Sequence, residues 1–118
     1  MTQAEKIELV AVYDGWIKVG YAYLGGELMF QRKLNDAFGY DNKIIDNLKY
    51  LTSLDWLHPV AMKVLDDVYA FNTPIGSRIY GKIFNHCASK PKEGQYLDLF
   101  EAVVEGIVFI NEQKFKTK

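Results

Sequence analysis

Two histidines and their neighbours are the residues whose types and spacing could do chemistry. His58 follows Asp55 by three positions, the spacing that places two side chains on one face of a helix. There a carboxylate could orient the imidazole as a general base, although the sequence offers no accompanying nucleophile. A histidine near a helix end more commonly packs or faces solvent. Both interpretations stay open for Asp55 and His58.

His86 and Cys87 are adjacent, in a chain with one cysteine and two histidines. A structural zinc site needs about four ligands. If this segment is a strand, the two side chains point to opposite faces and cannot hold one ion together. A catalytic cysteine also needs an oriented histidine and a third group, for which adjacency is weak evidence. We therefore expect no metal and no cofactor, and we interpret Cys87 as a buried or half-exposed thiol.

Two other patterns have ordinary explanations. Asp98, Glu101 and Glu105 recur at helical spacing, which could suit a cation, but an acidic stripe opposite an apolar face is normally the solvated side of a helix. Gly25 and Gly26 belong to no phosphate-binding pattern, because neither glycine-rich loop motif is present. Neither pattern indicates a site.

Aromatic residues are better candidates for a surface. Several of them fall on segments with strand-like composition: Trp16, Tyr21, Tyr23, Phe30, Tyr80 and Phe84. If both faces of a strand are aromatic, some of these rings must leave the core. An exposed aromatic face can bind a protein or stack on single-stranded bases, whereas core packing is the alternative. The candidate surface consists of Trp16, Tyr21, Tyr23, Asp55, His58 and Tyr80.

The most regular apolar pattern runs from residue 53 to residue 68. Its apolar positions have three-and-four spacing and predict a helix that continues through Pro59. Ser53 or Thr52 can cap its first turn, and Asp55 complements the helix dipole. Pro59 should bend this helix on its solvent side. A short 3₁₀ turn followed by a helix starting at Pro59 is the alternative.

The remaining elements are predicted from local signals. Thr2 and Glu5 fit a capping box that opens a first helix, which Gly15 ends. In the first half of the chain we also expect strands over 17–23 and 28–30 joined by a Gly-Gly turn, a loop over 31–41 and a short helix over 44–51. After the helix through Pro59 we expect extended segments over 69–71 and 78–84 around a turn at 72–76, and an exposed loop over 89–94. The chain should end with a helix over 96–113 and a frayed tail over 114–118. Gly106 within the last helix costs about 1 kcal/mol unless a neighbour packs close to the backbone.

Composition places the chain among ordinary folded proteins. With 118 residues, 49% hydrophobic and 25% charged, we expect a single domain over 1–118. The predicted fold class is α+β, with about three helices packed on one side of a small antiparallel sheet. The formal net charge of −1 does not support nucleic-acid binding. The sequence shows no secretory signal and no run of bilayer length, so we expect a cytoplasmic protein without a membrane partner.

Two segments resemble a known family. Residues 49–60, with Asp55-Trp56-Leu57 followed by Pro59-Val60, and residues 100–111 are similar to segments of small uncharacterised proteins encoded by phages and by bacteria of the Bacteroides group. Those proteins pair Tyr-His-Thr-Ser-Trp-Asp-Trp-Leu-Met-Pro-Val with Ala-Val-Val-Glu-Phe-Ile-Lys-Trp-Tyr-Asn. This chain departs from them at four positions: Leu51 for histidine, Leu54 for tryptophan, His58 for methionine and Gly106 for an aromatic residue. The resemblance implies a mobile-element origin and a compact α+β fold, but no activity.

Three functions follow as hypotheses. The first is a non-enzymatic phage or prophage accessory protein that binds a protein partner, or itself, through an aromatic or apolar patch. The second is a small enzyme or ligand binder that uses His58 with Asp55, or His86. The third is a single-stranded nucleic-acid binder.

Overall fold

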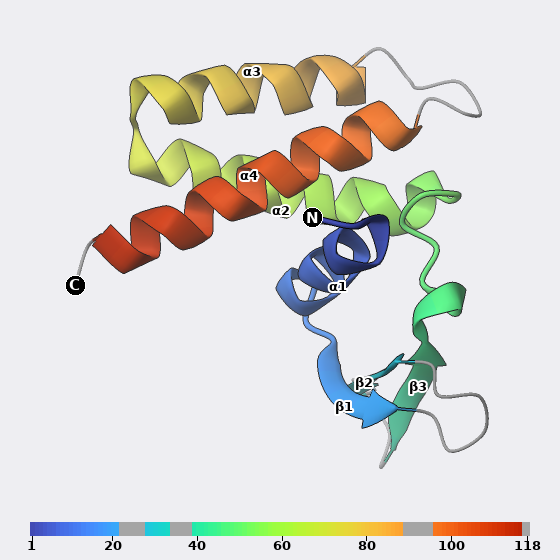
Figure 1. Ribbon diagram of the computed structural model, residues 1–118. Coiled ribbons are helices and arrows are strands. Elements are labelled where there is room, and N and C mark those ends of the chain that lie inside the picture. Colours follow the sequence, from blue (N-terminus) through green and yellow to red (C-terminus); the bar gives the residue numbers. More distant parts are fainter. Residues whose placement is uncertain (22–27, 34–38, 89–95, 117–118) are drawn as a thin grey trace. The chain divides into compact units, whose positions relative to one another are not determined.

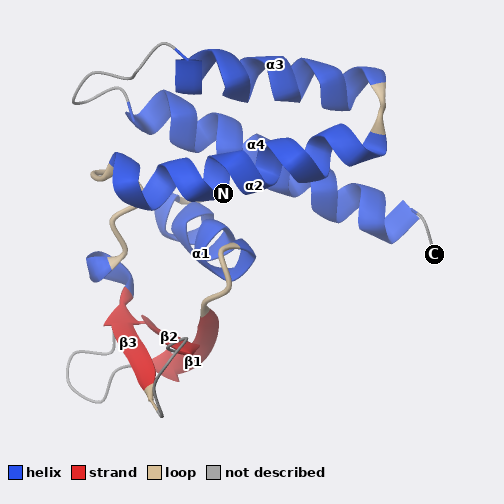
Figure 2. Cartoon of the chain, turned by 180° about the vertical axis from the view of Figure 1, so that it is seen from behind, coloured by secondary structure: helices blue, strands red, loops and turns tan. Residues whose placement is uncertain are grey.

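A computed structural model describes residues 1–21, 28–33, 39–88 and 96–116. Contacts between Cα atoms divide the chain into two compact units, Met1–Lys49 and Tyr50–Lys118. All described strands belong to the first unit, and the elements described in the second unit are helices (Figure 2).

The first unit opens with helix α1, Gln3–Tyr13. The Thr2 hydroxyl accepts the Glu5 N–H at 3.2 Å, and the Thr2 N–H donates to the Glu5 carboxylate at 3.2 Å. These bonds form the predicted capping box. The pKa of Glu5 is lowered, mainly because its carboxylate accepts the Thr2 backbone N–H. Asp14 is the C-cap, and Gly15 takes a φ of +101°, a conformation that favours glycine. The predicted first helix and its end are confirmed.

The sheet has three antiparallel strands in the order β1, β2, β3. Their bounds are Ile17–Tyr21, Leu28–Lys33 and Tyr40–Ile44, and a short 3₁₀ helix, η1, follows over Ile45–Asn47. The register of β1 shifts between Lys18 and Gly20, where Gly20 has a φ of +119°. The predicted loop over 31–41 is wrong at both ends, since β2 extends to Lys33 and β3 begins at Tyr40. The expected Gly-Gly turn lies outside the described residues.

Arg32 joins α1 to the sheet within this unit. Its Nη2 donates to the Asp14 carbonyl at 2.6 Å and to the Asp14 carboxylate at 2.7 Å. Its guanidinium carbon also lies 4.5 Å from the centroid of the Trp16 ring. A planar cation can satisfy both partners at once, by donating in its plane and stacking on its face.

The second unit opens with helix α2, Leu54–Phe71, which contains Pro59 in its interior. The prediction of one continuous helix is therefore confirmed against the alternative that begins at Pro59. Pro59 is exposed, as predicted. Because proline has no N–H, the carbonyl that would have accepted it is free, and on the solvent side water can donate to it. Ser53 occupies the N-cap position, but its side chain makes no capping hydrogen bond. The buried residues of α2 are Leu57, Val60, Ala61, Val64, Leu65 and Val68.

Helix α3, Pro74–Ala88, replaces the extended segment predicted over 78–84, and the one predicted over 69–71 is the last turn of α2. Asn72 ends α2 with a left-handed φ of 46°, and the Thr73 hydroxyl accepts the Gly76 N–H at 3.0 Å. Thr73 thus caps α3, and Pro74 takes its first position, where a missing N–H costs nothing. The β-branched and aromatic composition suggested strand, but Ile79 and Ile83 are buried at helical spacing.

Helix α4, Tyr96–Lys116, packs against both α2 and α3 (Figure 1). It confirms the predicted C-terminal helix and extends it to Lys116, where a frayed tail was expected. A Cβ placed on Gly106 would lie 2.6 Å from Val64 Cγ1 and 3.2 Å from Ile83 Cδ1. The glycine thus allows α2 and α3 to approach α4 closely, which is the condition under which its cost is offset.

The predicted α+β class and the small antiparallel sheet are confirmed. The described residues contain four α-helices, where about three were expected. The unpredicted one is α3, which sequence composition had placed among the strands. The single domain over 1–118 stays a prediction.

Replacing Gly106 by alanine should destabilise the protein. Val64 is fully buried and β-branched, so its methyl cannot rotate away easily. Overpacking of this kind costs about 1–3 kcal/mol, more than the helix-propensity gain of about 1 kcal/mol. The matched control is Gly81→Ala on α3, where nothing lies within 4 Å of an added Cβ. Denaturant unfolding should show lower stability for G106A and unchanged or higher stability for G81A; the reverse order contradicts this packing.

Replacing Arg32 by lysine should weaken the first unit, because an ammonium cannot donate in a plane and stack at once. We expect a loss of about 1–2 kcal/mol, since charge-assisted hydrogen bonds are worth about 1.5–3 kcal/mol and lysine keeps part of that. Hydrogen exchange of the β2 amides measures the effect. Arg78→Lys, at an exposed position of α3, is the control. Equal exchange rates in both variants argue against this role of Arg32.

Candidate aromatic interaction surface

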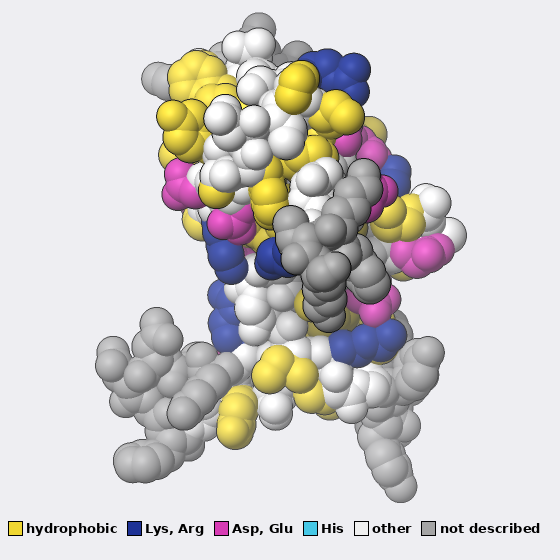
Figure 3. All heavy atoms as spheres, turned by 90° about the vertical axis from the view of Figure 1, so that its left-hand side faces the viewer, with side chains coloured by type: hydrophobic (Ala, Val, Ile, Leu, Met, Phe, Trp, Pro, Cys, Tyr) yellow, Lys and Arg dark blue, Asp and Glu magenta, His cyan; other side chains and the backbone are white. Residues whose placement is uncertain are grey.

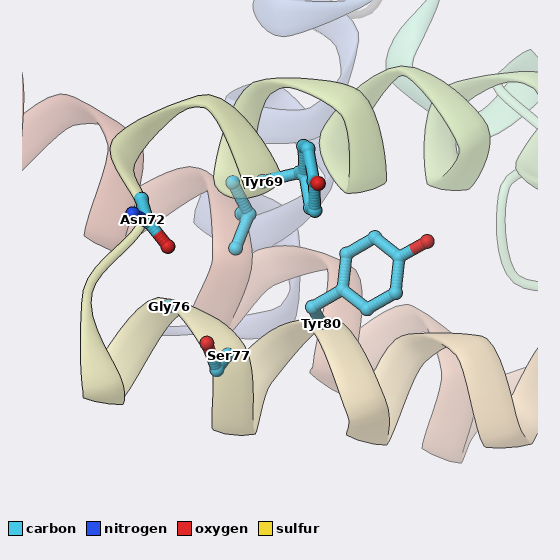
Figure 4. Close-up of a pocket in the computed structure, with 6 residues that line it drawn as sticks. Tyr69, Asn72, Gly76, Ser77 and Tyr80 are labelled. Carbon is cyan, nitrogen blue, oxygen red and sulfur yellow. The ribbon is translucent and has the colours of Figure 1, made fainter.

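A pocket of about 180 Å³ opens between the end of α2 and the start of α3 (Figure 4). Only Asn72 and Thr73 separate these helices, so their facing ends lie side by side. Gly76 and Ser77 line the pocket on the α3 side. The lining residues are Val68, Tyr69, Asn72, Gly76, Ser77 and Tyr80.

Three aromatic rings form a row that begins at this pocket, with Tyr69 on α2 and Tyr80 and Phe84 on α3. The centroids of Tyr69 and Tyr80 are 6.0 Å apart at an interplanar angle of 53°, and those of Tyr80 and Phe84 are 6.2 Å apart and nearly parallel at 9°. Tyr69 is 75% exposed, Phe84 is 52% exposed and Tyr80 is half-buried. We call Tyr69, Tyr80 and Phe84 the α2–α3 aromatic surface. Hydrophobic side chains also gather over the helical unit on the face drawn in Figure 3.

The side chains of α2 beside this surface are apolar or acidic. Met62, 44% exposed, precedes Tyr69 by two helical turns and lies on the same face. Asp66 precedes Tyr69 by three positions and is exposed. Asp66 makes no ion pair or hydrogen bond with any residue that the structure describes. Among the described residues, this carboxylate therefore has no cationic partner, and it lies one helical turn from Tyr69.

The predicted Asp55 and His58 are both exposed on α2. No hydrogen bond joins them, and neither interacts through a polar group with another described residue. A general base needs its imidazole held by such a bond. These two residues are therefore surface residues on the face that also carries Met62, without the arrangement of a catalytic pair.

The predicted aromatic candidates are separated by the structure. Tyr80 belongs to the α2–α3 aromatic surface, although it lies on a helix where a strand was expected. Trp16 is only 3% exposed and packs under Arg32, so it contributes to the first unit rather than to an accessible face. The backbone of Tyr21 pairs with Leu28 in the sheet. The side chain of Tyr21 and the whole of Tyr23 lie outside the residues that the structure describes.

His86 and Cys87 lie on α3, so the conditional argument from a strand does not apply to them. Both are half-buried, and burial raises the pKa of the Cys87 thiol. A nucleophilic cysteine requires the opposite shift. Within the described ranges, no three metal-binding side chains gather in one place.

The acidic stripe of α4 has structural partners. Glu105 pairs with Lys82 of α3 at 2.9 Å, with both side chains partly exposed. Glu101 is half-buried and has an interaction of its own, and Asp98 is exposed in the first helical turn. These carboxylates lie on the solvated side of α4, which is the alternative to a cation site that the sequence favoured.

Comparisons with models of known families, with curated proteins and with solved structures give no match for this chain. Across the described ranges, every helix is too short or too polar to span a bilayer. The site must therefore be interpreted from its own geometry.

Sequence reasoning missed Tyr69 as a surface residue. The signal was present at Asn72, Thr73 and Pro74, since asparagine tolerates the left-handed cap and Thr-Pro opens a helix. These three residues together predict two helices in close sequence, which places Tyr69 opposite Tyr80.

Alkylation should show that Cys87 is an unreactive thiol. A raised pKa means less thiolate at neutral pH, so iodoacetamide should modify the folded protein more slowly than glutathione at pH 7. The rate should rise with pH and should reach that of a free thiol in denaturant. A rate above that of glutathione at pH 7 contradicts this assignment and would revive a catalytic cysteine.

Proposed function

We propose that this chain is a non-enzymatic interaction protein that binds a segment of a protein partner through the α2–α3 aromatic surface. The consecutive rings of Tyr69, Tyr80 and Phe84, of which Tyr69 and Phe84 are exposed and Tyr80 is half-buried, carry this proposal. Tyrosine, phenylalanine and methionine are enriched at interfaces, because rigid rings bury much area at a small loss of side-chain entropy.

The size of the surface favours a segment over a whole globular face. An aromatic side chain buries about 150–250 Å², so the exposed parts of the three rings offer roughly 300 Å². A standard interface uses about 800 Å² per partner. The aromatic surface therefore suits a helix or an extended peptide with one or two anchoring side chains better than a second copy of the chain.

The alternative functions receive less support. Asp55, His58 and His86 do not assemble into one site within the described residues, and the pocket contains neither histidine. Stacked rings could hold single-stranded bases, but Asp66 beside them would repel a phosphate backbone. The resemblance to proteins of phages and Bacteroides-group bacteria supports an accessory role in a mobile element as part of the same proposal.

The proposal is tested by recovering partners from the native host with purified protein as bait. The variant Tyr69→Ala with Tyr80→Ala should lose at least about tenfold of the recovered partner, because interface hot spots cost 2 kcal/mol or more on truncation. The matched control is Tyr40→Ala, which removes a tyrosine 56% exposed on β3. Loss with Y40A and retention with the double variant would overturn the proposal, provided circular dichroism shows all three proteins folded.

A further inference from the structure

We infer that the pocket between α2 and α3 receives a single cationic side chain of the partner segment, arginine in preference to lysine. This inference rests on the proposed function and adds the chemistry of the anchoring residue. It combines three observations: the size of the pocket, its aromatic walls and the charge beside it.

The pocket has the size for one side chain. Its volume of about 180 Å³ lies below the range of about 300–1,000 Å³ that small-molecule and cofactor pockets occupy. It is open between two helix ends, so an occupant can enter while attached to a chain. A side chain of a partner segment therefore fits better than a free metabolite.

The lining of the pocket includes two aromatic rings and two side chains with oxygen atoms. The rings of Tyr69 and Tyr80 come from opposite helices and border the same opening (Figure 4). A ring face carries partial negative charge and attracts a cation placed within about 6 Å of its centroid. The side-chain oxygens of Asn72 and Ser77, both exposed, can accept hydrogen bonds. A guanidinium uses both features, since it stacks with its face and donates with its edge.

The charge beside the pocket has the complementary sign. Asp66 lies on the exposed face of α2, three positions before Tyr69, and has no partner among the described residues. The nearby cations are engaged: Lys82 pairs with Glu105, and Lys63 has an interaction within the protein. Arg78 is exposed, but it lies two residues from Tyr80 and so nearly on the opposite side of α3. The charge near the rings therefore favours a cation over an anion or an apolar group.

Nuclear magnetic resonance of ring-labelled tyrosines tests the inference with N-acetyl-arginine amide as the probe. Signals of Tyr69 and Tyr80, assigned with Tyr→Phe variants, should shift in a saturable manner, while those of Tyr40 stay unchanged. N-acetyl-norleucine amide and N-acetyl-glutamate amide are the apolar and anionic controls. The variant Asp66→Asn should weaken arginine binding about two- to fivefold, as expected for an exposed ion pair.

Two results overturn the inference. One is equal or larger shifts of Tyr69 and Tyr80 with either control amide. The other is no shift with the arginine amide at concentrations up to its solubility. Either result leaves the proposed function standing if the double tyrosine variant still loses its partner. If the double tyrosine variant keeps its partner, the proposed function itself is wrong, whatever the result with the amides.

Discussion

The close approach of three helices at Gly106 is the constraint on which the second unit depends. A single missing Cβ lets Val64 of α2 and Ile83 of α3 touch the backbone of α4. Ile79 and Ile83 turn toward α4, and Tyr80 and Phe84, each one residue later, are rotated by about 100° and stay outside. The same packing that forms the core therefore presents the aromatic rings on the outer face.

The sequence predicted the elements whose signals are local and consistent. The Thr2 and Glu5 capping box and the unbroken period through Pro59 were sufficient for α1 and α2. For α3 two signals conflicted. Its β-branched and aromatic residues are typical of strands, whereas the spacing of its isoleucines is typical of a helix. Burial against α4 decided between them, and burial depends on residues distant in the sequence. A local signal for helix was also present, at Asn72, Thr73 and Pro74 where α2 ends and α3 begins.

The candidate surface was predicted only in part, for the same reason. Tyr80 was identified as an exposed aromatic residue, but its neighbours on the surface come from the pairing of two helices. That pairing brings Tyr69 to within 6.0 Å of Tyr80, although eleven positions separate them in the chain.

We expect the outer face of α2 and α3 to contact another protein in the cell. Replacement of Phe84 by the photoreactive p-benzoylphenylalanine measures this most directly, with the same replacement at Tyr40 as reference. Irradiation in the native host should cross-link position 84 to one partner, at a peptide that contains arginine near the attachment point. Cross-links from position 40 to the same partner, with none from position 84, would contradict the account.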